Sequence, residues 1–267
     1  MTPRAPKRYL SRHLYIRRYC NLKYYIRPLS REQAAACKLF SLYGLIACLL
    51  CTQTAWAGPW TQEKSTAYLN TTLLYQTIEG QTAWRGEVYS EYGLTPDWTG
   101  IAKIDGLKFA DLSGFDQYGY QIGLRRALWQ KGRWQSAIEL SYIYGPNVIG
   151  IEQGCASPGG LIRFSFGANG QNKKGRDWYL FTDTALQQHK GCFRQRLEAG
   201  YGREIRENWT SITKFYLDFG TGYARSIKTE TLLSHRHGKT HIHIGVRQEL
   251  GGNFEEFGLI MGLERRF

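Results

Sequence analysis

The stretch that decides the fold is the last one in the chain, Glu256-Phe257-Gly258-Leu259-Ile260-Met261-Gly262-Leu263-Glu264-Arg265-Arg266-Phe267. Every second residue from Phe257 to Phe267 is large and apolar, apart from Arg265. The residues between them are small, apolar or charged. Successive side chains of a β-strand point to opposite faces, so this period of two predicts a strand between two unlike environments.

This alternation, with an aromatic residue at its end, resembles the closing strand of bacterial outer-membrane β-barrel proteins. The resemblance is to that broad class and to no single family. It implies a location in the bacterial outer membrane, contact with outer-membrane lipid, and recognition of Phe267 as an insertion signal by the barrel-assembly machinery. Arg265 departs from the pattern, because an aromatic or apolar residue is usual there. The alternative is the last strand of a soluble barrel or sandwich.

Residues 1–57 have the parts of a secretory signal. A basic segment extends to Lys38, an apolar run follows from Leu39 to Cys51, and Ala55-Trp56-Ala57 precedes Gly58. We therefore expect cleavage after Ala57, which leaves residues 58–267 as the barrel domain; acylation at Cys48 is the alternative. The leader also holds most of the excess positive charge of a chain whose net charge is +13. The high charge therefore gives no support to a nucleic-acid partner.

Two cysteines, Cys155 and Cys192, remain after the predicted cleavage. In an exported protein, two cysteines indicate one disulfide before they indicate a metal site. We place Cys155 in an outward loop and Cys192 at the outer end of a strand on the same face, so we expect them to form a disulfide.

Beyond Gly58, no apolar run approaches the roughly 20 residues that a membrane helix requires. Alternating segments of about ten residues recur instead, which is the length of a transmembrane strand. The predicted fold is therefore all-β, a single up-and-down antiparallel transmembrane barrel of about twelve strands without a plug segment. The twelve expected strands cover residues 65–77, 83–92, 98–107, 115–127, 133–144, 161–168, 177–187, 192–202, 209–219, 225–234, 240–250 and 254–267.

Tryptophans recur beside alternate turns. Indole rings prefer the headgroup boundary of a membrane, so this recurrence indicates an interfacial girdle at the periplasmic end. The alternative is that these rings fill a core. The predicted girdle consists of Trp60, Trp98, Trp129, Trp134, Trp178 and Trp209; Trp84 alone falls at the opposite end.

The inward positions of the strands collect charges of both signs. The acidic set is Glu87, Glu91, Asp105, Glu139, Asp183, Glu198, Asp218, Glu230, Glu249 and Glu264. The basic set is Arg85, Lys103, Arg125, Arg163, Arg194, Arg196, Lys214, Lys228, Arg247 and Arg266. This balance argues against a strongly ion-selective tube. It fits a narrow mixed-charge passage, or alternatively a lumen that ion pairs cross-link and close.

The four histidines around Gly238 allow one conditional metal site. If Gly238-Lys239-Thr240 formed a three-residue loop, His235, His237, His241 and His243 would share one face and could bind Zn²⁺ or Cu²⁺. The alternation of the preceding strand argues against this arrangement, because it turns His235 and His237 outward. We therefore expect no metal and no other cofactor.

Enzymes occur in the class that this chain resembles, notably outer-membrane phospholipases and lipid A deacylases. Those enzymes need a serine and a histidine on the same face, whereas Ser234 and His235 are neighbours and face opposite sides. No nucleophile elbow or phosphate loop occurs in the chain. The sequence therefore favours a small-solute channel or uptake protein. A structural or surface-interaction barrel without conductance and, less favoured, a lipid hydrolase are the alternatives.

Overall fold

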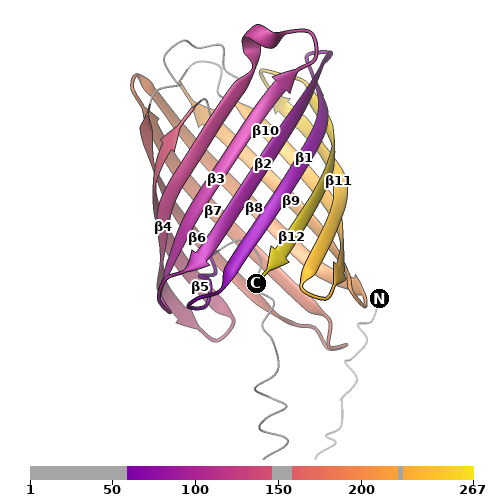
Figure 1. Ribbon diagram of the computed structural model, residues 1–267. Helices are drawn as coiled ribbons and strands as arrows, with labels where there is room; N and C mark the ends of the chain where they lie inside the picture. Colours follow the sequence, from indigo (N-terminus) through magenta and orange to yellow (C-terminus); the bar gives the residue numbers. More distant parts are fainter. Residues whose placement is uncertain (1–58, 146–157, 222–224) are drawn as a thin grey trace, which may run out of the picture. The chain divides into compact units, whose positions relative to one another are not determined.

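The computed structural model describes residues 59–145, 158–221 and 225–267. Within these ranges the chain forms twelve strands that close into one antiparallel barrel (Figure 1). The strands are β1 (Ala67–Ile78), β2 (Gln81–Gly93), β3 (Trp98–Phe109), β4 (Gln117–Lys131), β5 (Trp134–Tyr144), β6 (Gly159–Gln171), β7 (Asp177–His189), β8 (Cys192–Arg206), β9 (Trp209–Gly220), β10 (Ser226–His237), β11 (Thr240–Gly252) and β12 (Glu256–Arg266). A short 3₁₀ helix, Ser113–Phe115, lies between β3 and β4.

The fold class and all twelve expected strands are confirmed, and each strand boundary falls within four residues of its predicted position. The largest differences are at the ends of β4 and β8, which continue further than their alternation predicts. Both strands contain a register irregularity there, between Ala127 and Trp129 and between Glu204 and Arg206. A bulge of this kind shifts the side-chain phase by one residue and so hides the strand from a period-two pattern.

The barrel closes between its first and last strands. β1 and β12 pair in antiparallel register from Tyr68 opposite Arg266 to Ile78 opposite Glu256. The amide of Phe267 also donates a hydrogen bond to the carbonyl of Ala67, at 3.0 Å. We call the end of the barrel where β1 begins and β12 ends the terminal end; the C label marks it in Figure 1. The opposite end is called the distal end.

The outward face of the wall is apolar along its length. In β12 the side chains of Phe257, Leu259, Met261 and Leu263 are exposed, whereas Gly258 and Ile260 between them are buried. The same outward exposure is found for Tyr118 and Ile122 of β4, Leu140 of β5 and Ile242 of β11. An apolar outer face on a closed barrel is the arrangement that lipid requires, because lipid cannot satisfy polar groups or an open sheet edge.

No helix in the described parts of the chain is both long enough and apolar enough to cross a membrane.

Candidate functional site: the lumen of the barrel

The barrel encloses a cavity of about 290 Å³, lined by side chains from the inward positions of the strands. Its charged lining is nearly balanced. Ten basic side chains line it: Arg85, Lys103, Arg125, Arg163, Arg194, Arg196, Lys214, Arg225, Lys228 and Arg247. Nine acidic side chains line it: Glu87, Asp105, Asp183, Glu198, Asp218, Glu230, Glu249, Glu256 and Glu264. Almost all of the charges that sequence alternation placed inward therefore meet in one cavity.

Two deeply buried carboxylates, Glu91 and Glu139, lie beside Arg125 on β4. Its Nη1 lies 2.7 Å from Oε1 of Glu91, and its Nη2 lies 3.1 Å from Oε2 of Glu139. Nη2 also donates to the hydroxyl of Tyr89 at 3.0 Å. Oε1 of Glu139 accepts a hydrogen bond from the side-chain amide of Gln121 at 2.7 Å. One guanidinium thus bridges two buried carboxylates, because its planar fork presents donors in two directions. We call these five residues the Arg125 cluster. Arg163 supplies a second positive charge, since its Nη1 lies 3.6 Å from Oε2 of Glu139.

Three further networks connect neighbouring strands around the lumen. On β8 and β9, Asp218 lies 3.1 Å from Arg194 and 2.8 Å from Arg196. On β9 to β11, Glu230 lies 3.2 Å from Lys214 and 2.6 Å from Arg247.

In the third network, Lys228 of β10 pairs with both Glu249 and Glu256. Most of the inward charges of these strands are therefore engaged in cross-strand pairs. Such pairs connect neighbouring strands of the wall, and each balances charges of opposite sign within it.

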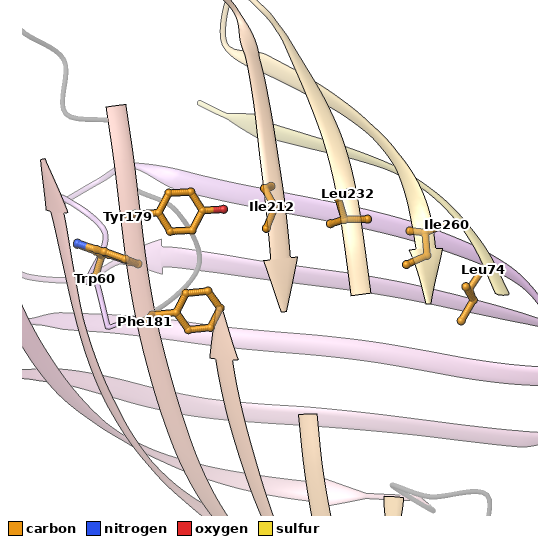
Figure 2. Packing of buried hydrophobic residues seen from close by; sticks show 7 residues of the cluster. All are labelled: Trp60, Leu74, Tyr179, Phe181, Ile212, Leu232 and Ile260. Carbon is orange, nitrogen blue, oxygen red and sulfur yellow. The ribbon is translucent and has the colours of Figure 1, made fainter. Parts of the chain in front are cut away.

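An apolar band interrupts the charged lining on the other side of the lumen. It consists of Leu74, Tyr179, Phe181, Ile212, Leu232 and Ile260, all buried and inward-facing. Figure 2 shows these side chains following one another along the wall. The strand register explains the row, since Tyr179, Gly202 and Ile212 occupy paired positions on β7, β8 and β9. The row continues through Leu232, Gly245, Ile260 and Leu74.

Glycines make room for the large side chains of this band. A Cβ added to Gly202 would lie 2.1 Å from the ring of Tyr179, and one added to Gly200 would lie 2.3 Å from the ring of Phe181. Each aromatic ring thus lies over a glycine of the neighbouring strand and remains close to the wall. The glycines therefore allow bulky side chains to face inward while they stay close to the wall.

Residues 59–62, which precede β1, lie inside the barrel at its terminal end. Pro59, Trp60 and Gln62 are all buried. The indole of Trp60 meets the ring of Tyr179 edge to face, with 6.2 Å between centroids. Figure 2 shows Trp60 beside the two aromatic members of the band. The sequence predicts no segment inside the barrel, whereas residues 59–62 lie in the lumen; they show no alternation that could have indicated it.

The same finding corrects the predicted tryptophan girdle. Trp60 is 3% exposed and belongs to the lumen, so it is not an interfacial residue. Trp98, Trp129 and Trp134 are exposed on the outside of the wall near the terminal end, and Trp178 and Trp209 are half-buried at the same end. Guanidinium groups lie over two of these rings, Arg126 over Trp98 and Arg133 over Trp178.

The conditional histidine site is also corrected. The turn between β10 and β11 contains two residues, Gly238 and Lys239, because His237 pairs with Thr240. Gly238 has a φ of 62°, the left-handed conformation that such a tight turn uses. The register sets Ser234 opposite His243 and His235 opposite Ile242. His235 and His237 therefore face outward while His241 and His243 face the lumen, and the four imidazoles do not share a face.

No group of three or more metal-ligating side chains that could hold a metal ion occurs in the described ranges. The register also separates Ser234 from His235. Ser234 is buried on the lumen side, whereas the ring of His235 contacts Trp209 on the outside, with 4.6 Å between ring centroids. These two residues therefore cannot act together as a nucleophile and its base.

Two other predictions concern residues outside the described ranges. Cys192 begins β8 at the distal end, but Cys155 lies outside the residues that the structure describes, so their disulfide stays a prediction. The predicted leader, residues 1–57, lies outside them as well.

Phe267 is exposed, and the guanidinium of Arg265 lies 5.1 Å from its ring centroid. The departure at Arg265 is thus accommodated on the outer surface beside the terminal ring.

The fold is that of bacterial outer-membrane β-barrels, as comparison with solved structures establishes. An outer-membrane channel of the COG4313 group from Pseudomonas putida F1 superposes with a TM-score of 0.55 at 8% identity, over 80% of this chain and all of that one. The NanC porin gives 0.53 at 10% identity, over 74% and 98%. The KdgM porin gives 0.52 at 9% identity, over 74% and 99%. No family model and no curated protein matches the sequence.

Proposed function

We propose that this protein is a channel for small polar solutes in the bacterial outer membrane. The observation that carries the proposal is a cavity of about 290 Å³ inside a closed barrel, lined by charged side chains of both signs. A polar cavity inside an apolar outer wall suits the passage of hydrated solutes across lipid. The similar structures described above are porins and channels, which supports the same function.

The terminal end faces the periplasm in this proposal. Single-chain bacterial barrels have an even number of strands and keep their short turns on the periplasmic side. At the terminal end the connections β4–β5, β8–β9 and β10–β11 contain only two residues each. The outward tryptophans of this end would then lie at the inner headgroup boundary, and Phe267 would be available for recognition during insertion.

The paired charges define the solutes that the channel would take. A strongly anionic or cationic solute would gain little from the lumen, because most of the inward charges already have a partner within the wall. One solved KdgM porin is described as a complex with disordered oligogalacturonate, an acidic oligosaccharide. For the present chain we instead propose neutral or zwitterionic polar solutes, since ten basic and nine acidic side chains line its cavity.

Conductance of the refolded protein in a planar bilayer tests this function. We expect discrete ohmic steps with weak selectivity between anions and cations. Strong charge selectivity would contradict the proposed solute class. The absence of steps, together with hydrolysis of phospholipid or lipid A, would favour the lipid hydrolase instead. The absence of both activities would favour a structural or surface-interaction barrel.

A further inference from the structure

The segment of residues 59–62 is attached to both sides of the lumen at the terminal end. Its backbone carbonyl at Trp60 accepts a hydrogen bond from Nη1 of Arg125, at 3.3 Å. The backbone amide of Gln62 donates to the hydroxyl of Thr99 at 2.9 Å, and its side-chain amide donates to Oε2 of Glu91 at 2.5 Å. The ring of Trp60 packs on the opposite, apolar side, against Tyr179.

The wall is complementary to this segment in both chemistry and shape. Glu91 is 2% exposed, and its two carboxylate oxygens have different partners: Oε1 contacts Arg125, whereas Oε2 accepts from Gln62. Without the segment, Oε2 and the buried hydroxyl of Thr99 would lose these hydrogen bonds. The segment covers both groups and also satisfies them, so this part of the wall is complementary to a peptide backbone and an amide side chain.

The segment joins β1 through a tight reversal at Ser65. This residue has a φ of 65°, a left-handed conformation that non-glycine residues seldom adopt. The amide of Ser65 donates to the carbonyl of Gly93 at 2.8 Å, and the amide of Gly93 donates to the carbonyl of Thr66 at 3.0 Å. The reversal directs the chain from the rim of the barrel back into the lumen. If the leader is cleaved after Ala57 as the sequence predicts, only Gly58 precedes Pro59, so the segment is tethered at Ser65 alone.

We infer that the lumen at the terminal end is a peptide-binding site whose occupant is the chain's own residues 59–62, and that this segment closes the channel at its periplasmic mouth. The inference rests on the proposed channel function. It adds that permeation requires the segment to leave its site by pivoting at Ser65. The indole of Trp60 and the side-chain amide of Gln62 are the two groups that hold it in place.

Gly93 offers a way to expel the segment without shortening the chain. A Cβ added to Gly93 would lie 1.9 Å from the carbonyl oxygen and 2.6 Å from the carbonyl carbon of Glu63, and 2.9 Å from the carbonyl oxygen of Gln62. All of these atoms belong to the segment or to its connection, and none belongs to the barrel wall. Gly93 also lacks a positive φ, so its backbone accepts alanine. Gly86 on the same strand is the matched control, because a Cβ there meets nothing within 4 Å.

The experiment compares Gly93→Ala, Gly86→Ala and the parent protein in planar bilayers, with Trp60→Ala as a second way to release the segment. We expect Gly93→Ala and Trp60→Ala to raise the mean conductance by about twofold or more, since conductance grows with the narrowest cross-section of a pore. Gly86→Ala should match the parent. Equal conductance in all four proteins would overturn the inference that residues 59–62 close the channel.

A second measurement follows the segment without using conductance. Thr61→Cys, at the half-buried residue between the two groups that hold the segment, is treated with a membrane-impermeant maleimide in detergent, in a chain that lacks residues 1–57 and whose Cys155 and Cys192 are changed to serine. We expect slow labelling in this background and faster labelling after the addition of Gly93→Ala. Fast labelling in both would show that the segment is not held in the lumen, and the inference would fail. If labelling shows release but every protein is silent in bilayers, the proposed channel function is what fails.

Discussion

The two sides of the lumen wall at the terminal end are built on different principles. On one side, the Arg125 cluster from β2, β4 and β5 buries two carboxylates that share one guanidinium. On the other, the apolar band from β1, β7, β9, β10 and β12 relies on volume, with aromatic rings lying over glycines. The charged side depends on every partner being present, because a buried charge without a partner costs more than a missing methyl group. The apolar side depends on shape alone.

The largest expected effect comes from removing the shared guanidinium. Arg125→Met leaves Glu91 and Glu139, each with a side chain 1% exposed, without their common partner. Breaking a buried pair in this way destabilises a protein by about 3–5 kcal/mol. Urea unfolding of the protein refolded into lipid vesicles would measure the loss. Arg125→Lys should recover part of it, since a single ammonium cannot bridge both carboxylates. If Arg125→Met lowered the free energy of unfolding by less than Gly202→Ala, the distinction between the charged side and the apolar side would fail.

An intermediate effect is expected from crowding the apolar band. Gly202→Ala places a Cβ 2.1 Å from the ring of Tyr179, so the ring must move away from the wall. Overpacking of this kind costs about 1–3 kcal/mol. Gly160→Ala on β6 is the control, because a Cβ there meets nothing within 4 Å. The same urea titration compares the two variants. Equal stability would mean that Tyr179 turns freely into the lumen and that the band is not packed.

The smallest effect is expected from an ion pair that water reaches. Lys103 lies 2.6 Å from Glu87, but the two side chains are 25% and 36% exposed. Lys103→Met should therefore change the unfolding free energy by less than about 1 kcal/mol, the range measured for exposed pairs. The change should also shrink in high salt, whereas the loss caused by Arg125→Met should depend little on salt. A loss as large as that of Arg125→Met would show that pairing, and not burial, sets the contribution of lumen charges.

The outer face and the lumen face of the wall differ in how far the sequence predicts them. Lipid accepts only apolar side chains, so the outer face imposes a period of two that runs through β12 from Phe257 to Leu263. That period also indicated the charges that line the cavity. The lumen imposes no such rule, since both Arg125 and Ile212 are buried in it. The sequence of one strand therefore shows where an apolar residue interrupts the inward polar positions. It does not show which residues of other strands pack beside that residue in the band.

Sequence alone determined the number of strands, their approximate boundaries and the outward side of each, because these follow from local alternation against a uniform lipid environment. The pairing of β1 with β12 followed as well, since a barrel in lipid cannot leave an edge open. Tertiary structure alone decided the two-residue turn at Gly238 that separates the histidines, and the inward position of Trp60. Both depend on register and on contacts between strands far apart in the chain, such as Thr99, Arg125 and Tyr179 around one short segment. The period of two cannot predict such contacts, because it is the same in every strand and does not depend on which residues lie opposite across the lumen.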